Sequence, residues 1–340
     1  MRNLCVLTHR VLLSLALLAC ANAAPGDTDG RTDGRTDGRT GTVQFQPGAD
    51  EAELPQMYRL EAASFEFQQR PVTTTATGYR VWELTFPSPL KTPFEVNNTV
   101  HGEYFCPVPP GKHPAVIVLH ILGGDFNLSR LFARQLAQGG VAALFIKLPY
   151  YGPRRPAGVK MRMVSEDPRE TVAGMRQAVL DIRRGIAWLA AQEEIDADRL
   201  GIFGISLGGI TGALTLAIEP KLRMGCLMLA GGDVAQVAWE SERLAKIRNH
   251  WLGQGGTKEE FFALFKSIDP VTYAQRARGK RMLMLNAAHD EIIPPVCTQS
   301  LWRALGQPEI VWYEAGHITA ARFLLDGLAR VTTFFKTAQP

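Results

Sequence analysis

The sequence predicts an α/β fold in which helices cover both faces of a mostly parallel central sheet. Short apolar runs alternate with amphipathic segments over most of the chain, which is typical of parallel strands joined by helical crossovers. The runs are uniformly apolar, as expected of strands that are covered on both sides. They lie at residues 115–119, 141–146, 200–203, 227–230, 282–285 and 310–313.

The first 23 residues are predicted to be a secretory signal. A basic start precedes the apolar run Val11–Ala19, which is too short to span a bilayer. Ala21-Asn22-Ala23 suits cleavage to a soluble product, whereas Leu17-Leu18-Ala19-Cys20 is typical of a bacterial lipobox with Cys20 lipidated. We therefore expect an exported protein, either periplasmic or anchored to a membrane through Cys20.

A polar T-D-G-R repeat follows the signal and predicts a flexible linker over residues 24–42, because such a segment buries no apolar surface. Removal of the signal takes away Arg2 and Arg10. Lys and Arg then fall from 37 to 35 against 33 acidic residues, which leaves a net charge of +2. A chain so close to neutral gives no indication of nucleic-acid binding.

The remaining residues, 43–340, suit one large domain. Alternating apolar and polar residues at 80–86 and 99–105 predict half-buried antiparallel strands at the start of the sheet. Asp167, Pro168 and Glu170 predict the start of a long helix, since they suit the cap, first and third positions. Further helices are predicted at 131–138 and 297–305, and a closing helix carries Phe323, Leu324, Leu328 and Val331.

Between Asp233 and Tyr273 the alternation stops, and the segment becomes amphipathic and rich in aromatic residues. This predicts a helical insertion. It could form a small cap over the edge of the sheet, or it could pack on the side of the domain.

Three cysteines lie in the predicted domain: Cys106, Cys226 and Cys297. An odd number in an exported protein permits one disulfide and one free thiol. Cys226 stands in an apolar run and is expected to be a small buried side chain. No C-x-x-C or H-E-x-x-H spacing occurs, so we expect no catalytic metal and no cofactor.

The segment from Arg199 to Leu214 contains a G-x-S-x-G pattern, Gly204-Ile205-Ser206-Leu207-Gly208. A predicted strand precedes it and a helix of small residues follows it, which is the setting of a nucleophile elbow. Glycine is needed on both sides because side chains there would collide with the neighbouring strand and helix. We expect the Ser206 hydroxyl to be the nucleophile and the Leu207 N–H to stabilise an oxyanion.

An acid and a base follow the serine in the order that a catalytic triad requires. Asp290 comes just after the predicted strand 282–285, and His317 comes just after 310–313. The carboxyl ends of parallel strands meet at one edge, where open α/β sheets place their ligands. His317 is expected to take the proton of Ser206, and Asp290 is expected to hold the other imidazole nitrogen.

Other residues compete for these roles. Glu291 and Asp233 are alternative acids, but Asp290 is preferred because Ile292, Ile293 and Pro294 then close its loop into the next helix. His289 is not expected to be the base, since it lies beside the acid and not after the last strand.

These motifs resemble those of α/β-hydrolase-fold serine esterases, near the dienelactone-hydrolase and acetyl-xylan-esterase-like branch. The likeness covers about residues 80 to 335 and rests on H-I-L-G-G, Y-G-x-R, D-x-R-R-G-I-x-W-L, G-I-S-L-G-G, H-D-E-I-I-P and A-G-H. The family usually has glycine after the histidine of the first motif, where this chain has Ile121. By position, the second oxyanion donor is expected to be the N–H of Leu122, with that of Ile121 as the alternative.

The loop Pro149–Pro156 follows a predicted strand and is expected near the rim of the site. Tyr151 and Arg154 are candidate substrate-binding residues there, since Arg154 or Arg155 could receive a carboxylate or phosphate of the substrate. The alternative is that these arginines are simply solvated.

The resemblance and the triad together predict a serine hydrolase that cleaves small-molecule or lipid carboxylic esters through an acyl-enzyme. A dienelactone hydrolase proper would resemble an enzyme with a cysteine nucleophile, which Ser206 argues against. A thioesterase or phospholipid deacylase with the same triad is an alternative, and so is a non-catalytic binding protein of this fold. A peptidase related to prolyl oligopeptidases is disfavoured, because too few residues precede His113 to form a propeller.

Overall fold

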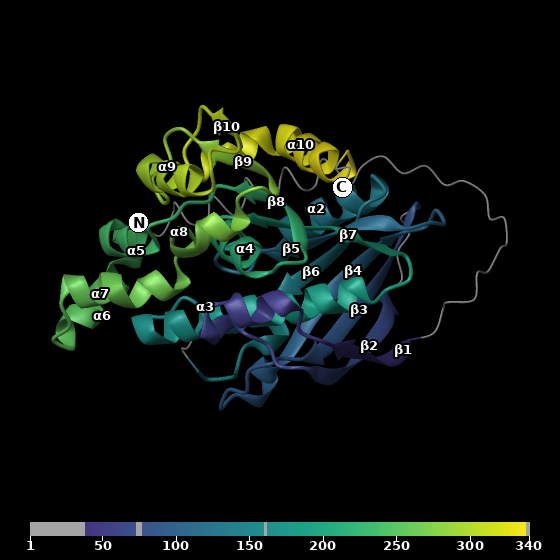
Figure 1. Ribbon diagram of the computed structural model, residues 1–340. Helices are drawn as coiled ribbons and strands as arrows, with labels where there is room; N and C mark the ends of the chain where they lie inside the picture. Colours follow the sequence, from purple (N-terminus) through teal and green to yellow (C-terminus); the bar gives the residue numbers. More distant parts are fainter. Residues whose placement is uncertain (1–37, 73–76, 160–161, 338–340) are drawn as a thin grey trace. The chain divides into compact units, whose positions relative to one another are not determined.

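A ten-stranded sheet organises residues 38–72, 77–159 and 162–337, which are the residues described by the computed structural model (Figure 1). The strand order across the sheet is β1-β2-β3-β4-β6-β5-β7-β8-β9-β10. The strands are β1 (Arg39–Phe45), β2 (Ala63–Val72), β3 (Tyr79–Pro87), β4 (Thr99–Pro107), β5 (His113–Leu119), β6 (Ala142–Lys147), β7 (Ile195–Ile205), β8 (Leu222–Met228), β9 (Arg281–Ala287) and β10 (Glu309–Tyr313).

The sheet has an antiparallel part and a parallel part. Strands β1 to β4 pair antiparallel, and β4 pairs antiparallel with β6. From β6 to β10 all pairings are parallel. The prediction of a mostly parallel sheet that begins with antiparallel strands is therefore confirmed. The carboxyl ends of the parallel strands share one edge, where their loops can meet.

Helices cover both faces of this sheet (Figure 1). On one face, α2 (Phe126–Gln138) and α10 (Leu324–Lys336) share a core with the sheet that includes Phe132, Leu136, Val331 and Phe335. The other face carries α3 (Pro168–Ala190), α4 (Leu207–Ile218) and α9 (Pro295–Ala304), whose core includes Ile186, Leu214 and Leu301. Each side of the sheet thus buries its own apolar layer, which explains the uniformly apolar strands.

The long helix α3 begins where the sequence predicts. Asp167 is its N-cap and accepts a hydrogen bond from the backbone N–H of Arg169, with Pro168 in the first turn. Helix α2 begins at Phe126 and not at Leu131, because Asp125 caps it through the N–H of Asn127. The cap residue, and not the first apolar repeat, sets the start of α2.

The segment from Asp233 to Tyr273 is helical, as predicted. It contains α5 (Val234–Glu240), α6 (Ala245–Gly253), α7 (Lys258–Phe265) and α8 (Pro270–Tyr273), with short 3-10 turns between them. Trp239, Trp251 and Phe265 pack around Phe261, which is fully buried. Helix α7 lies against α3, and α8 lies against α4. That the segment from Asp233 to Tyr273 acts as a cap stays a prediction.

The predicted linker ends earlier than expected. Strand β1 begins at Arg39, and its first four residues pair with Glu66–Gln69 of β2, so residues 39–42 belong to the sheet. Val43 and Phe45 are buried and hold the strand in register, while Gly41 lies against the ring of Phe67. The signal segment, Cys20 and residues 24–37 of the linker lie outside the described residues and stay predictions. Among the described residues, no helix has the length and apolar character needed to cross a bilayer.

Cys106, Cys226 and Cys297 are all buried, and no disulfide joins any two of them. Burial raises the pKa of the Cys226 thiol, in agreement with its predicted place in the core.

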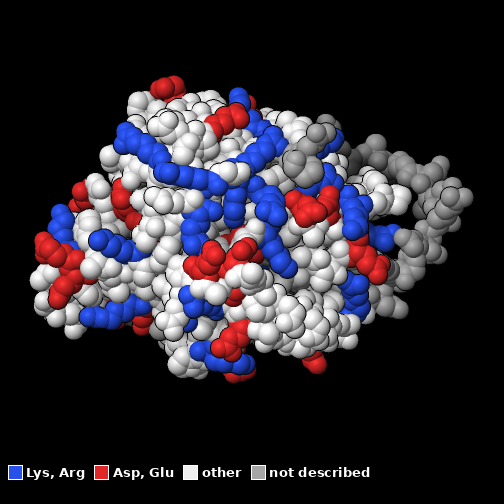
Figure 2. All heavy atoms as spheres, viewed as in Figure 1, with Lys and Arg blue, Asp and Glu red and all other residues white. Residues whose placement is uncertain are grey.

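Charged side chains of both signs share the face shown in Figure 2. Lys and Arg side chains gather in a band across it, and acidic side chains interrupt this band. The face is therefore mixed in charge.

Candidate active site

Ser206 lies at the sharp turn between β7 and α4. Its backbone has φ 55° and ψ −115°, a conformation that L-residues seldom adopt. Its N–H donates to the carbonyl of Met228 at 2.9 Å, which ties the turn to the neighbouring strand. The turn thus presents the side chain at the carboxyl edge of the sheet, before the first turn of α4.

The glycines beside Ser206 are required by close backbone approach. A Cβ on Gly204 would lie 2.1 Å from the carbonyl oxygen of Gly208. A Cβ on Gly208 would lie 2.7 Å from the oxygen of Leu119 and 2.8 Å from that of His120. Both glycines of the G-x-S-x-G pattern are therefore required for steric reasons, as predicted from the sequence.

The structure brings Ser206, Asp290 and His317 together, although they come from three different loops. Asp290 follows β9, and His317 follows β10. The distance from His317 Nε2 to Ser206 Oγ is 2.9 Å, and that from His317 Nδ1 to Asp290 Oδ2 is 2.7 Å. Both residues are largely shielded from solvent, since Asp290 is 6% exposed and His317 is 8% exposed.

The partners of Asp290 determine where the proton of His317 lies. An ionised carboxylate can only accept, so Nδ1 carries the hydrogen and donates it to Asp290, and Nε2 is free to accept from the Ser206 hydroxyl. The other oxygen of Asp290 accepts the N–H groups of Ile292 and Ile293 at 2.9 and 2.7 Å. This fixed carboxylate orients the imidazole toward the serine.

The competing residues form other contacts. Glu291 contacts the backbone of His317 and not its ring, because its Oε2 accepts the His317 N–H at 2.9 Å. Asp233 precedes α5 and lies near Asp269. His289 is largely exposed, and its Nε2 forms a hydrogen bond with Glu314 at 3.0 Å. Asp290 is therefore the acid that the geometry joins to the imidazole.

The loop after β5 lies directly beside the serine turn, as the contacts of Gly208 show. The carbonyl of Ile121 accepts from His120 Nδ1 at 2.8 Å and from the Gly124 N–H at 3.3 Å. Because C=O and N–H of one peptide point in opposite directions, this fixes the Leu122 N–H facing away from the His120 ring. Leu122 is 47% exposed at this edge.

His120 is buried among aromatic rings and holds this loop. Its Nε2 accepts the backbone N–H of Leu148 at 3.1 Å, and the ring of Tyr151 lies edge-on with centroids 4.6 Å apart. Burial lowers the pKa of His120 to about 4, so the ring is neutral at pH 7. Tyr151, a predicted substrate-binding residue, is itself buried here and packs against Gly124.

The prediction that Arg154 faces the substrate is wrong. Arg154 is fully buried and forms an ion pair of 2.7 Å with Asp181 of α3. Its Nη1 donates to the carbonyl of Lys147 at 3.1 Å, and Nη2, which also pairs with Asp181, donates to the carbonyl of Asn97 at 2.8 Å. The guanidinium has its partners inside the protein and cannot reach a ligand at the rim.

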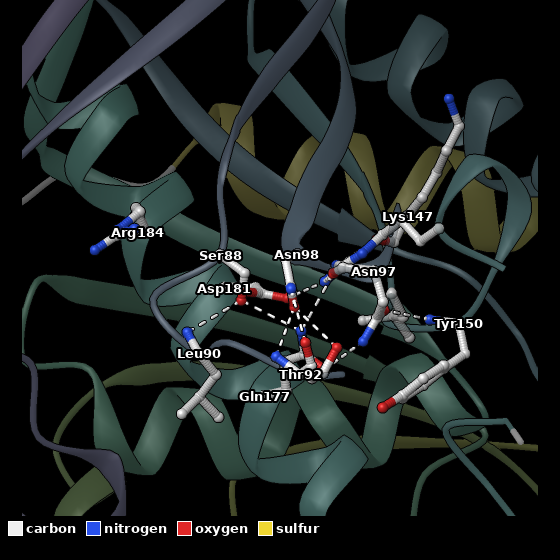
Figure 3. A network of polar contacts seen from close by, with 12 residues as sticks. Ser88, Leu90, Thr92, Asn97, Asn98, Lys147, Tyr150, Gln177, Asp181 and Arg184 are labelled. Carbon is white, nitrogen blue, oxygen red and sulfur yellow. Dashed lines mark hydrogen bonds and ion pairs between the residues drawn. The ribbon is translucent and has the colours of Figure 1, made fainter. Parts of the chain in front are cut away.

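A buried polar network surrounds this ion pair, and the sequence analysis did not find it (Figure 3). Ser88 donates to Asp181 at 2.6 Å, Asn97 donates to Gln177 at 2.8 Å, and the Tyr150 N–H donates to Asn97 at 2.9 Å. The network holds the loop that carries Tyr151 and thereby supports the His120 loop. The members of this network are distant in sequence, and the only hint was that Gln177 and Asp181 lie on the inner side of the predicted long helix.

Comparison with known proteins identifies two related family models. The model described as "Alpha/beta hydrolase domain containing 18" matches residues 56–242, and that described as "Prolyl oligopeptidase family" matches residues 175–338.

Individual relatives match smaller parts of the chain. An uncharacterized protein of Mycobacterium tuberculosis is 31% identical over 172 residues, which are 50% of this chain and 40% of that protein. A probable 2-oxo-3-(5-oxofuran-2-ylidene)propanoate lactonase of Bradyrhizobium is 32% identical over 120 residues, 35% of this chain and 46% of its own length. The chain thus spans less than half the length of these relatives.

Solved structures share the fold over most of the chain. Acetyl xylan esterase 1 from Thermoanaerobacterium superposes with a TM-score of 0.65 at 19% identity, over 80% of this chain and 88% of its own. A putative dienelactone hydrolase from Klebsiella pneumoniae gives 0.53 at 22% identity, over 77% of this chain and 100% of its own. The expected α/β-hydrolase fold is confirmed.

Proposed function

The chain belongs to the family of α/β hydrolases described as alpha/beta hydrolase domain containing 18, and on that premise we propose that it is a serine hydrolase that cleaves carboxylic esters through an acyl-enzyme. The observation that carries the proposal is the continuous contact from Ser206 through His317 to Asp290, with distances of 2.9 and 2.7 Å. These three side chains come from separate loops, and their contacts suit the His317 tautomer that proton transfer requires.

In the first step, Ser206 Oγ attacks the ester carbonyl and its proton passes to His317 Nε2. Asp290 stabilises the imidazolium that forms. The bond to the alcohol then breaks, and His317 returns the proton to the departing oxygen. A water molecule, activated by His317 in the same way, attacks the acyl-enzyme and releases the acid and the free serine.

The negative charge on the carbonyl oxygen needs donors in each step. We assign this role to the N–H groups of Leu207, at the start of α4, and Leu122. The fixed Ile121–Leu122 peptide supports the choice of Leu122, because its carbonyl is already tied to His120 and Gly124. One such donor typically lowers the barrier by about 3 kcal/mol.

The test is labelling with a fluorophosphonate, followed by hydrolysis of p-nitrophenyl esters graded from acetyl to long acyl chains. Ser206→Ala should abolish labelling, and Ser206→Ala and His317→Ala should each lower turnover by about 10⁴-fold or more. The double variant should lose little further, since the residues act as a unit. His289→Ala is the matched control, because this exposed histidine of the adjacent loop should be dispensable. Labelling that persists in Ser206→Ala would exclude this nucleophile.

A prolyl peptidase is the second candidate, since the prolyl oligopeptidase model matches residues 175–338. The described residues before β5 form strands of the same sheet and not a propeller, which favours the esterase. Prolyl p-nitroanilides in the same panel separate the two activities. Thioesters, phospholipids and a lactone are added to the substrate panel, because an acyl-enzyme can also form from these compounds.

A further inference from the structure

The carboxylates of two consecutive residues form hydrogen bonds with His317, one with its ring and one with its backbone. Asp290 Oδ2 accepts the ring Nδ1–H at 2.7 Å, and Glu291 Oε2 accepts the backbone N–H at 2.9 Å. A side chain held only at its ring can still shift with its backbone. Holding both ends confines Nε2 to the place where it meets Ser206, at 2.9 Å.

The backbones of the same two loops are also joined. The N–H of Ala288 donates to the carbonyl of Tyr313 at 2.9 Å, and that of His289 donates to Ala315 at 3.0 Å. These bonds extend the β9–β10 pairing past the strand ends and stop before Gly316. From there to His317, Glu291 supplies the next contact between the loops.

Gly316 shows how closely this carboxylate fits. A Cβ at Gly316 would lie 2.4 Å from Glu291 Oε2 and 3.3 Å from the carbonyl oxygen of His289. Gly316 is not among the glycines with positive φ, so its backbone conformation does not itself demand glycine. The absence of a side chain there makes room for the carboxylate.

We propose that Glu291 is a positioning residue, which holds the backbone of His317 so that its imidazole stays aligned between Asp290 and Ser206. The inference rests on the proposed function, since the alignment matters only if His317 transfers the proton. Glu291 is exposed apart from this contact, so its replacement should disturb the site and leave the core intact.

The test compares Glu291→Ala with Glu291→Gln on a p-nitrophenyl ester that the wild-type enzyme cleaves. Glu291→Ala should lower kcat about tenfold with KM little changed, because misalignment affects the proton transfer and not binding. Glu291→Gln keeps an oxygen that accepts the N–H and should retain most of kcat. Glu314→Gln, which alters the neighbouring exposed hydrogen bond to His289, is the control and should behave as wild type.

A double-mutant cycle then tests the contact with Gly316. Gly316→Ala should lower kcat in the wild-type background, because its methyl group displaces the carboxylate, and should cost less in the Glu291→Ala background. Unchanged kcat in Glu291→Ala, equal losses in the Ala and Gln variants, or an equal cost of Gly316→Ala in both backgrounds would each overturn the inference. A wild-type protein that neither hydrolyses esters nor reacts with fluorophosphonate would instead refute the proposed function.

Discussion

Replacing Arg154 with methionine separates a structural role from a substrate-binding role. The side chains of Arg154 and Asp181 are both 0% exposed and lie 2.7 Å apart. Methionine fills similar space without charge, so it leaves Asp181 as a buried carboxylate whose remaining side-chain donor is Ser88. It also removes the donors from the carbonyls of Lys147 and Asn97.

The expected loss follows from this burial. Breaking one half of a buried ion pair typically costs about 3–5 kcal/mol, because the other charge is left without compensation. For a domain of this size, that loss lowers Tm by roughly 10 °C. Burial already raises the pKa of Asp181 against the opposing effect of Arg154. In the variant, Asp181 can take up a proton at low pH, so the destabilisation should grow as the pH rises through the raised pKa of this carboxyl group.

The assay is equilibrium urea unfolding, with KM measured on the folded enzyme. The double variant Arg154→Met/Asp181→Leu removes both charges and should regain most of the lost stability. KM should stay close to the wild-type value in either variant. Wild-type stability with a raised KM in Arg154→Met would show that the guanidinium reaches the substrate, and it would refute this reasoning.

Two further predictions concern the loop and turn beside the serine. Gly208→Ala should strongly reduce kcat and stability, because the added Cβ meets the carbonyl oxygens of Leu119 and His120 at 2.7 and 2.8 Å. Gly212→Ala is the matched control, since the nearest neighbour of a Cβ there is 3.6 Å away. Equal effects of the two substitutions on kcat and on urea unfolding would contradict the steric account. Burial lowers the pKa of His120 to about 4, below its ordinary 6.5, so the unfolded chain binds more protons in this window and the free energy of unfolding should fall as pH drops from 6.5 to 4. The fall should reach at most about 3 kcal/mol in urea titrations and shrink in His120→Gln; an equal fall in the variant would exclude His120 as its source.

Local signals in the sequence were sufficient for the architecture. Uniform apolar runs separated by amphipathic segments predicted the parallel strands and the two helical layers, because burial on both faces leaves a continuous apolar pattern. Asp167 and Pro168 predicted the start of α3, which the structure confirms. The glycines around Ser206 predicted a tight turn, since a close backbone approach restricts composition at fixed spacing.

Other features could not be predicted, because their causes lie in contacts between distant segments. The linker and β1 meet at Arg39 and not at residue 43, since pairing with β2 decides where the strand begins. Glu291 was a rival acid in the sequence, and only the arrangement of the two loops places it on the backbone of His317.

The sequence by itself determined the order and spacing of strands, helices and reactive side chains, because those depend on neighbours along the chain. The tertiary structure decided the environment of each charge. Arg154 stands in a polar, proline-rich loop that suggests exposure, yet Asp181 on α3 and carbonyls from two other segments draw it inside. A buried charge depends on partners that arrive from elsewhere in the fold, and local sequence carries no record of them.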